Sequence, residues 1–425
     1  MTISVHAPSY YAASANEDAH HPKLDGDINT DVCVIGGGIT GLSSALHLAE
    51  AGFDVVLIDG ERIGWGASGR NGGQICTAYN KSMDEIEALV GQDGAQAFWE
   101  VERAAKDLIR NRVKKHNIDC DLQWGYLHTA AKPSHMSWVT ETQDEWARYG
   151  YTDTEVLNKS QLQERVGTEA YHGALWEQNA GHLHPLNYTL GLARAAKDTG
   201  VRLFEDTRAT HIEQRPAPKI TTPSGTISAR YIITAGNAYL GKLIPHLYHR
   251  VMPVKSFILA TEPLGDDRAR SLIRDNDAVT DTNHICNYMR LSADGRMLFG
   301  GRANYTGTEP RDLFPYMRPR MLKIFPQLEN AGLDFCWGGT LAITLDRMPH
   351  VGKIDNTLFF AHGYSGHGVA LAGIAGKLMA DAVQGTAEKF DVLARIKHQP
   401  FPGGPVRMPM LAIGMLYYKL RDMMS

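Results

Sequence analysis

Three glycines and one acid near the N-terminus have the types and the spacing to bind a phosphate-rich ligand. Residues 36–41 read Gly-Gly-Gly-Ile-Thr-Gly and match the pattern G-x-G-x-x-G. In that pattern Gly36 allows a tight turn, Gly38 lets a pyrophosphate approach the backbone, and Gly41 lets a helix pack on a strand. Asp59 could then accept hydrogen bonds from a ribose. Alone, such a glycine pattern is often only a loop, so its surroundings decide its meaning.

The elements around these residues are those of a dinucleotide-binding βαβ unit. An apolar run at 32–35 predicts a buried parallel strand, and apolar residues then recur at helical spacing over 42–49. A second apolar run, 55–58, ends directly before Asp59. The N-terminus of the intervening helix would offer free N–H groups and a partial positive charge to the phosphates. We therefore predict dinucleotide binding, with Ile39 and Thr40 also beside the cofactor.

Residues 60–74 form a second glycine-rich loop, which a nicotinamide dinucleotide would not need. Its glycines exclude a helix or a regular strand. A flexible linker is one interpretation, but linkers rarely carry Trp, Arg, Asn and Gln between their glycines. The other interpretation is a backbone held against a flat ligand, and a flavin ring extends beyond the nucleotide site. We expect the flavin to be bound here by Gly60, Arg62, Gly66, Ala67, Ser68, Arg70, Asn71, Gly72, Gly73 and Gln74.

A third glycine turn lies near the C-terminus. A strand predicted at 358–361 leads into His-Gly-Tyr-Ser-Gly-His-Gly-Val at 362–369, and a helix is predicted over 369–384. Such a helix N-terminus would stabilise negative charge on a reduced flavin, although an ordinary capped helix has the same pattern. Another apolar strand, 231–234, ends in a small-residue turn. We place Gly366, His367, Gly368, Val369, Ala209, Ala235 and Gly236 beside the cofactor.

Composition limits the classes of function. A net charge of −4 over 425 residues gives no electrostatic case for nucleic acid or anionic membrane. No apolar run is long enough to span a bilayer, and the N-terminus lacks the apolar core of a secretion signal. The five cysteines are scattered without a C-x-x-C pair, and the paired histidines at 182 and 184 have no third ligand nearby. We expect a cytoplasmic protein without a metal site.

The order of the predicted elements indicates an α/β protein with a discontinuous Rossmann-like domain and a second domain of mixed β-sheet and helices. We assign residues 28–84, 160–252 and 345–390 to the FAD-binding domain, and residues 85–159 and 253–344 to the substrate domain. Residues 1–27 form an N-terminal arm. Residues 391–425 form a tail, too short to span a membrane, which could contact a membrane surface.

Several long stretches resemble the D-amino-acid-oxidase-like flavoproteins. They are the fingerprint at 36–41, GWGASGRNGGQ at 64–74, GHLHPLN at 181–187, RLSADGRMLFGG at 290–301, LDRMPHVG at 345–352 and GYSGHGV at 363–369. Within that family the chain is most similar to members that oxidise gamma-glutamylputrescine in bacterial putrescine breakdown. The resemblance implies FAD as cofactor. Some members of that family attach the flavin covalently through a Cys or a His. This chain has no His at 67–74 and no Cys at 337–346, with Cys336 just outside that range, so the resemblance implies non-covalent binding.

One departure from the family bears on the substrate. Relatives that act on α-amino acids often place a carboxylate-binding Arg about five residues before the Asp of a D-x-x-P segment, and here that position is Leu341. An Arg binds a carboxylate through two parallel hydrogen bonds, which Leu cannot make. An ω-amine whose carboxylate is distant, such as gamma-glutamylputrescine, fits this change. Arg290 or Arg302 could still anchor a carboxylate elsewhere.

We therefore predict an FAD-dependent amine oxidase or dehydrogenase. A small-molecule amine would be oxidised to an imine, which hydrolyses to an aldehyde and ammonia, with electrons passed to oxygen or another acceptor. The alternatives are a secondary-amine or amino-acid oxidase, such as one for L-pipecolate, a non-catalytic or RNA-modifying flavoprotein, and a plain NAD dehydrogenase. No second dinucleotide unit supports a reductase. Our candidates for the substrate pocket are Tyr288, Arg290, Trp337 and His184.

Overall fold

Two β-sheets form the framework of the structure. It is a computed structural model that describes residues 4–214, 217–304 and 310–402. The first sheet contains the apolar runs of the predicted βαβ unit, and its central strands are parallel, as expected for strands buried on both faces. Its order is β16 (His350–Lys353), β17 (Leu358–His362), β10 (Gly225–Thr234), β1 (Ile28–Ile35), β2 (Val55–Ile58) and β7 (Arg202–Phe204), with β8 (His211–Glu213) and β9 (Lys219–Thr222) extending from β10.

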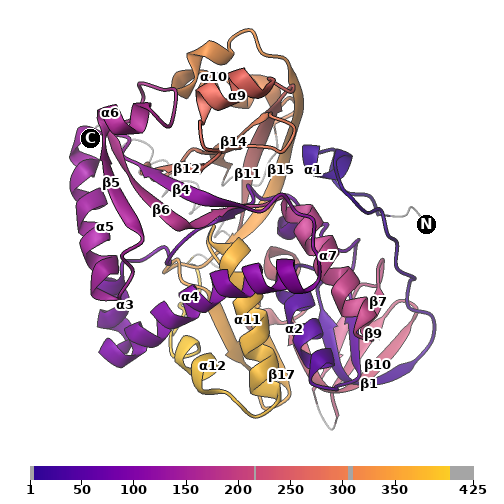
Figure 1. The fold of residues 1–425 in the computed structure, drawn as a ribbon. Coiled ribbons are helices and arrows are strands. Elements are labelled where there is room, and N and C mark those ends of the chain that lie inside the picture. The colour runs from indigo at the N-terminus through magenta and orange to yellow at the C-terminus, as the bar shows by residue number, and fades with distance from the viewer. Residues whose placement is uncertain (1–3, 215–216, 305–309, 403–425) are drawn as a thin grey trace.

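Helices α2 (Ile39–Glu50) and α11 (Gly368–Val383) pack against each other beside this sheet, and α4 (Gln92–Lys115) and α7 (Pro185–Asp198) lie next to them (Figure 1). The backbones of α2 and α11 approach each other closely. A Cβ at Gly376 would lie 2.4 Å from the carbonyl oxygen of Thr40. Because α2 and α11 follow the first and third glycine turns, this contact brings the two turns together.

The second sheet is mostly antiparallel and lies above the first in Figure 1. Helices α5 (Met136–Arg148), α9 (Asp266–Leu272) and α10 (Phe314–Ile324) surround it in the same view. Its order is β15 (Leu333–Ile343), β11 (Met252–Thr261), β14 (Met297–Asn304), β13 (Tyr288–Leu291), β12 (Ala278–Asp281), β4 (Gln123–Thr129), β6 (Gly173–His182) and β3 (Gln74–Ile75), with β5 (Thr154–Asn158) also paired to β6.

Short helices complete the described chain. The helical segment from 83 to 115 is divided at Gly91, whose φ of 78° ends the first helix. The remaining helices are α1 (Tyr10–Ala13), α3 (Met83–Val90), α6 (Lys159–Gln163), α8 (Pro245–Tyr248), α12 (Glu388–Leu393), and the single turns η1 (Ala67–Gly69), η2 (Pro133–His135), η3 (Asn237–Tyr239) and η4 (Pro326–Leu328).

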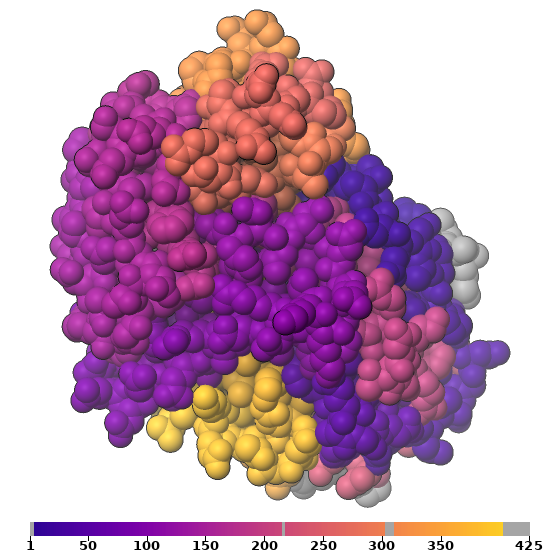
Figure 2. Space-filling view, in the orientation of Figure 1, coloured from indigo at the N-terminus to yellow at the C-terminus, as the bar shows by residue number. Residues whose placement is uncertain are grey.

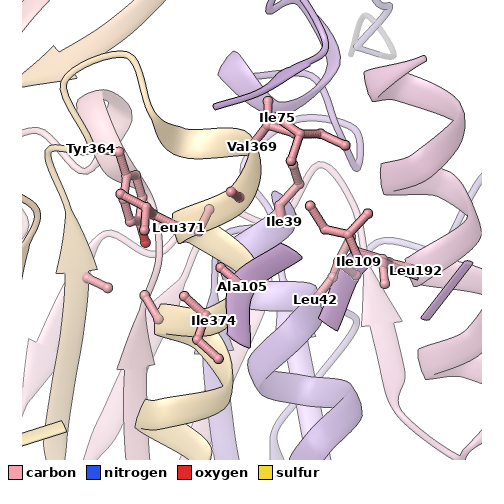
Figure 3. Close-up of a cluster of buried hydrophobic side chains, with 14 of the residues drawn as sticks. Ile39, Leu42, Ile75, Ala105, Ile109, Leu192, Tyr364, Val369, Leu371 and Ile374 are labelled. Carbon is pink, nitrogen blue, oxygen red and sulfur yellow. The ribbon is translucent and has the colours of Figure 1, made fainter. Parts of the chain in front are cut away.

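The largest hydrophobic cluster lies where four helices meet (Figure 3). Side chains from α2, α4, α7 and α11 converge there, and all are almost fully buried. Burial of each large aliphatic side chain stabilises the fold by roughly 1.5–3 kcal/mol. The cluster therefore fixes the positions of the helices that begin at the glycine turns. The residues labelled in the figure are Ile39, Leu42, Ile75, Ala105, Ile109, Leu192, Tyr364, Val369, Leu371 and Ile374.

The predicted domain boundaries differ from the sheets at two strands, and the first is β3, which was assigned to the FAD-binding domain with residues 28–84 but pairs with β6 of the second sheet. Residues 160–252 were assigned to the FAD-binding domain, but β6, at 173–182, is paired with β3, β4 and β5 of the second sheet. Both parts of the assignment are wrong. The apolar pattern of 173–182 indicates a strand and says nothing about its partners, and β6 pairs with strands from distant parts of the sequence.

The N-terminal arm is more integrated than predicted, and the predicted start of the tail falls within a helix. In the arm assigned to residues 1–27, Tyr10 and Tyr11 of α1 are buried, and Figure 2 shows the indigo N-terminal segment lying along one edge of the molecule. Helix α12 crosses the predicted start of the tail at residue 391. Residues 403–425, on which the predicted membrane contact depends, lie outside the described residues. None of the described helices is long and apolar enough to cross a bilayer.

Candidate cofactor and active site

A cavity of about 550 Å³ lies between the two sheets, which is within the usual range for ligand sites. All three glycine turns contribute to its wall, together with strands of the second sheet. Among the residues predicted to bind the cofactor, those in the wall are Gly36, Gly38, Ile39, Thr40, Asp59, Gly60, Gly66, Ala67, Ser68, Arg70, Asn71, Gly72, Gln74, Ala209, Ala235, Gly236, Gly366, His367, Gly368 and Val369.

The first turn leaves no room for side chains. Gly36 has a φ of 119°, and a Cβ there would lie 2.8 Å from the backbone of Ala235. A Cβ at Gly38 would lie 2.7 Å from Oγ of Ser68, and that oxygen accepts a hydrogen bond from Ile39 N at 3.0 Å. The bare backbone at the start of α2 therefore faces the cavity, as binding of a pyrophosphate requires.

Asp59 is held at the end of β2 by two backbone donors. Its carboxylate accepts hydrogen bonds from Gly37 N at 2.6 Å and from Glu61 N at 2.8 Å. Burial outweighs these hydrogen bonds and raises the pKa of Asp59 to about 6. The carboxylate therefore lies beside the glycine turn, in the cavity wall, where a ribose hydroxyl could donate to it.

The second glycine loop is stiffened by its own side chains. Arg70 donates from Nε to the carbonyl oxygen of Trp65 at 2.6 Å and lies over that indole ring at 4.2 Å. Asn71 donates to the carbonyl oxygen of Ala67 at 2.9 Å and accepts from Gly73 N at 2.7 Å. These contacts hold an irregular backbone rigidly along the cavity, which is the arrangement expected for a flat ligand and not for a flexible linker.

Three residues predicted to contact the cofactor are outside the cavity wall. Gly41 lies behind the turn, where a Cβ would be 1.9 Å from the carbonyl oxygen of Gly36, so its role here is close packing of α2. The buried guanidinium of Arg62 contacts the N-terminal arm, with Nη2 2.8 Å from Asp18 and 3.0 Å from the carbonyl oxygen of Ala19. Gly73 packs against β6 and the residues that follow it.

Of the four residues predicted to form the substrate pocket, only Tyr288 lies in the cavity wall. Arg290 is buried behind it and donates to the carbonyl oxygens of Gly72 at 2.8 Å and Leu183 at 3.1 Å. Trp337 donates from Nε1 to the carbonyl oxygen of Arg70 at 3.0 Å.

His184 is the N-cap of α7 and accepts from Asn187 N at 3.1 Å. Arg290, Trp337 and His184 therefore support the second glycine loop and its neighbours from outside the cavity. Their types indicated chemistry, but their bonding partners come from segments far away in the sequence.

The wall that the second sheet provides was not predicted from the sequence. Strand β4 lies between β12 and β6, and its alternation places Tyr126 and His128 toward the cavity. Period-2 alternation in 123–129 was visible, but the neighbours of β4 were not. Other wall residues that were not predicted include Cys76, Asn80, Ser256, Ile258, Thr280, His284, Ile285, Cys286 and Arg347.

The third turn places His367 in the wall directly before α11. Its Nδ1 lies 2.7 Å from the side-chain nitrogen of Asn80, and Asn80 also donates to the carbonyl oxygen of Ser365 at 2.7 Å. Burial lowers the pKa of His367 to about 4, so the ring is neutral at physiological pH. The positive end of α11 therefore faces the cavity without a competing histidine charge. Across residues 4–214, 217–304 and 310–402, no group of three or more His, Cys, Asp or Glu side chains could hold a metal ion.

Comparison with known proteins agrees with this geometry. Residues 31–382 match the DAO family, described as FAD dependent oxidoreductase. The chain belongs to this family. It is 44% identical to gamma-glutamylputrescine oxidoreductase of Escherichia coli (strain K12), covering 99% of both chains. It is 39% identical to the probable oxidoreductase OrdL of Haemophilus influenzae, over 98% of this chain and 97% of that protein.

Solved structures share the fold. Glycine oxidase from Geobacillus kaustophilus has a TM-score of 0.75 at 22% identity, covering 87% of this chain and 99% of that chain. L-proline dehydrogenase from P. horikoshii has a TM-score of 0.74 at 23% identity, covering 88% and 98%. As a member of the DAO family, the protein is an FAD-dependent oxidoreductase, and the glycine cradle fits that cofactor.

Proposed function

We propose that this DAO-family enzyme oxidises the primary amine of gamma-glutamylputrescine. The observation that carries the proposal is the identity of 44% over 99% of both chains with the Escherichia coli enzyme of that name. Similarity that extends over the whole chain includes the second sheet, which provides the wall opposite the glycine turns. The identity with the Escherichia coli enzyme therefore covers the residues of the substrate wall as well as those of the cofactor wall.

The residues present define how FAD would be held. We assign the pyrophosphate to the backbone around Gly36 and Gly38, the ribose to Asp59, and the flavin ring to the loop 66–74. When bound, FAD supplies a two-electron acceptor for a hydride equivalent from the carbon that bears the nitrogen. The chain's own contribution is to orient the amine, exclude water, and place the positive end of α11 where negative charge develops.

The cavity wall supports an amine with no neighbouring carboxylate. Leu341 lies in that wall, and its strand partner Val254 on β11 lies there with it. An α-amino-acid oxidase that anchored its substrate carboxylate at this position would need a cation here, because a carboxylate buried without a partner costs several kcal/mol. Arg290 cannot replace it, since it lies behind the wall and four of its five N–H donors are used by backbone carbonyls and by Tyr11. The side chain of Arg302 lies outside the described part of the structure.

Product analysis tests this proposal. Purified holoenzyme incubated with gamma-glutamylputrescine should release ammonia and an aldehyde in equal amounts, measured by enzymatic ammonia assay and by hydrazone trapping. Hydrogen peroxide formed in air would identify oxygen as the acceptor, and reduction of an added dye without peroxide would identify another acceptor. Turnover of L-pipecolate with no turnover of gamma-glutamylputrescine would contradict the proposal and favour an amino-acid oxidase.

We also propose that the enzyme acts in the cytoplasm. Its five cysteines are all unpaired thiols in the structure, which supports a reducing compartment.

A further inference from the structure

A histidine in the cavity wall forms a hydrogen bond with a fully buried carboxylate. His128 of β4 lies in the wall, and its Nε2 is 2.9 Å from Oε1 of Glu177 on β6, whose side chain has no solvent exposure. Tyr126, two residues earlier on β4, stacks on the imidazole at 4.6 Å with an interplanar angle of 27°. Because β4 and β6 are hydrogen-bonded neighbours, both the distance and the ring orientation are fixed by the sheet.

The carboxylate is kept ionised by its own partners. Burial alone would raise the pKa of Glu177, but its hydrogen bond with His128 and the charge of Lys106 are among the contacts that outweigh burial and lower that pKa. The second oxygen of Glu177 accepts from the hydroxyl of Tyr151 at 3.1 Å. An ionised Glu177 requires a proton on Nε2 of His128, which leaves Nδ1 as an unprotonated acceptor in the neutral ring. No hydrogen bond to Nδ1 is formed by any residue within the described ranges.

We propose that His128, oriented by Glu177, accepts the proton that the substrate ammonium must lose before oxidation. This inference rests on the proposed function. An alkyl amine has a pKa of about 10, so at neutral pH it enters the cavity as an ammonium ion with no free electron pair on nitrogen. In the proposed step one N–H bond of the ammonium breaks, the proton goes to Nδ1 of His128, and the electron pair stays on nitrogen. Nothing is oxidised or reduced in this step.

The surroundings of His128 suit a base that is charged only briefly. From α4, the buried ammonium of Lys106 lies 3.1 Å from the carboxylate of Glu102, which partly compensates its charge. From α5, the uncharged rings of Trp138 and Trp146 approach within 6.3 and 5.8 Å. The remaining titratable groups nearby are neutral at physiological pH.

These neutral groups are the hydroxyls of Tyr126 and Tyr151 and the imidazole of His367. Burial raises the pKa of both hydroxyls and lowers that of His367. An imidazolium formed at His128 therefore has one uncompensated counter-charge within hydrogen-bonding distance, the carboxylate of Glu177. A carboxylate that orients a histidine and stabilises its cationic form is a recurring arrangement for proton transfer.

The test is the pH dependence of flavin reduction in the holoenzyme. The rate of anaerobic bleaching by saturating gamma-glutamylputrescine is measured from pH 6 to 10 for the wild type, His128→Gln and Glu177→Gln. We expect His128→Gln to lose about 10²–10⁴-fold at pH 7. The loss should shrink above pH 9, where the amine deprotonates in solution. Glu177→Gln should move the midpoint of the rate profile to lower pH, because the imidazole loses its anionic partner.

His182→Gln is the matched control. That imidazole is also buried, lies on β6, and bonds to the carbonyl oxygen of Asn276 at 2.8 Å, but it is outside the cavity wall. Its rate profile should match the wild type. Thermal unfolding and flavin content are measured for each variant. If His128→Gln does not retain flavin, the midpoint of Glu177→Gln decides.

Three results would overturn the inference. They are a loss in His128→Gln that is equal at pH 7 and pH 9.5, a wild-type rate in that variant, and an unchanged midpoint in Glu177→Gln. If the wild type itself is not bleached at any pH, the proposed function fails and this inference fails with it. A bleached wild type with a pH-independent loss in the variant removes only the inference.

Discussion

Asp59 shows how one residue can be prepared for a ligand. Its carboxylate is buried and receives two backbone hydrogen bonds, yet its pKa stays above the ordinary value because burial is the largest influence. A ribose hydroxyl would add a donor that stabilises the ionised form. The position of Asp59 after the second strand was predicted from the sequence. The raised pKa was not, because it depends on how deeply β2 is buried.

Binding of FAD to the apoprotein should weaken as the pH falls through about 6. Below that pH Asp59 is protonated in the free protein, and forming its hydrogen bond to ribose then requires loss of the proton. Affinity should fall by up to about tenfold per pH unit, since at most one proton is released. Quenching of flavin fluorescence measures this. Asp59→Asn should bind FAD more weakly and remove this pH dependence; an unchanged slope in that variant would contradict the assigned role.

FAD should be released completely by denaturation. Cys336, the cysteine nearest the family's attachment region, packs with the second hydrophobic cluster and not in the cavity wall. Cys76 and Cys286 do line the cavity, but burial raises their thiol pKa values to about 11 and about 12, which suppresses the reactive thiolate. All flavin should appear in the supernatant after acid precipitation. Flavin fluorescence on a denaturing gel band would contradict this prediction.

At the scale of elements, the site depends on how closely α2 and α11 approach. The βαβ unit could be predicted because strand, turn, helix and acid are contiguous in the sequence. The contact between α2 and α11 could not, because these helices lie more than three hundred positions apart and small residues carry no periodic signal. The wrong assignment of β6 and the misplaced Arg290 have the same origin, since their partners are set by long-range register.

Substituting Gly376 by Ala should separate α2 from α11. The new Cβ would lie 2.4 Å from the Thr40 carbonyl oxygen, and such overpacking costs about 1–3 kcal/mol of unfolding free energy. Gly373→Ala, on the same helix, is the control. Its Cβ would meet neighbours at 3.8 Å, so it should be neutral or stabilise by up to about 1 kcal/mol. Denaturant unfolding and flavin retention measure both variants, and equal stability would contradict this account of the helix contact.

At the scale of the whole molecule, the N-terminal arm is anchored to the second sheet. Tyr11 is fully buried, its ring meets Trp337 of β15 at 5.2 Å, and its hydroxyl accepts from Arg290 of β13 at 3.2 Å. The polar composition of residues 1–27 predicted only an arm. Its two adjacent tyrosines anchor it, and that signal was present but has no periodicity from which burial could be recognised.

Removing this anchor should destabilise the whole protein. Tyr11→Ala should lower the unfolding free energy by about 3–5 kcal/mol, as for other buried aromatic residues, and should leave Arg290 with one unpaired donor. Val5→Ala on the same arm, at a side chain that is 69% exposed, should change it by less than about 0.5 kcal/mol. Thermal and denaturant unfolding measure the difference. Similar stability of the two variants would mean that the arm is not anchored through Tyr11.

The most direct test of the account is anaerobic bleaching of the bound flavin. The absorbance of the purified holoenzyme near 450 nm is followed after mixing with gamma-glutamylputrescine, putrescine and L-pipecolate in parallel under nitrogen. We predict rapid bleaching by gamma-glutamylputrescine and little or none by L-pipecolate, because Leu341 provides no partner for a carboxylate next to the amine. Bleaching by L-pipecolate alone would contradict this prediction, and would require a carboxylate anchor elsewhere in the cavity.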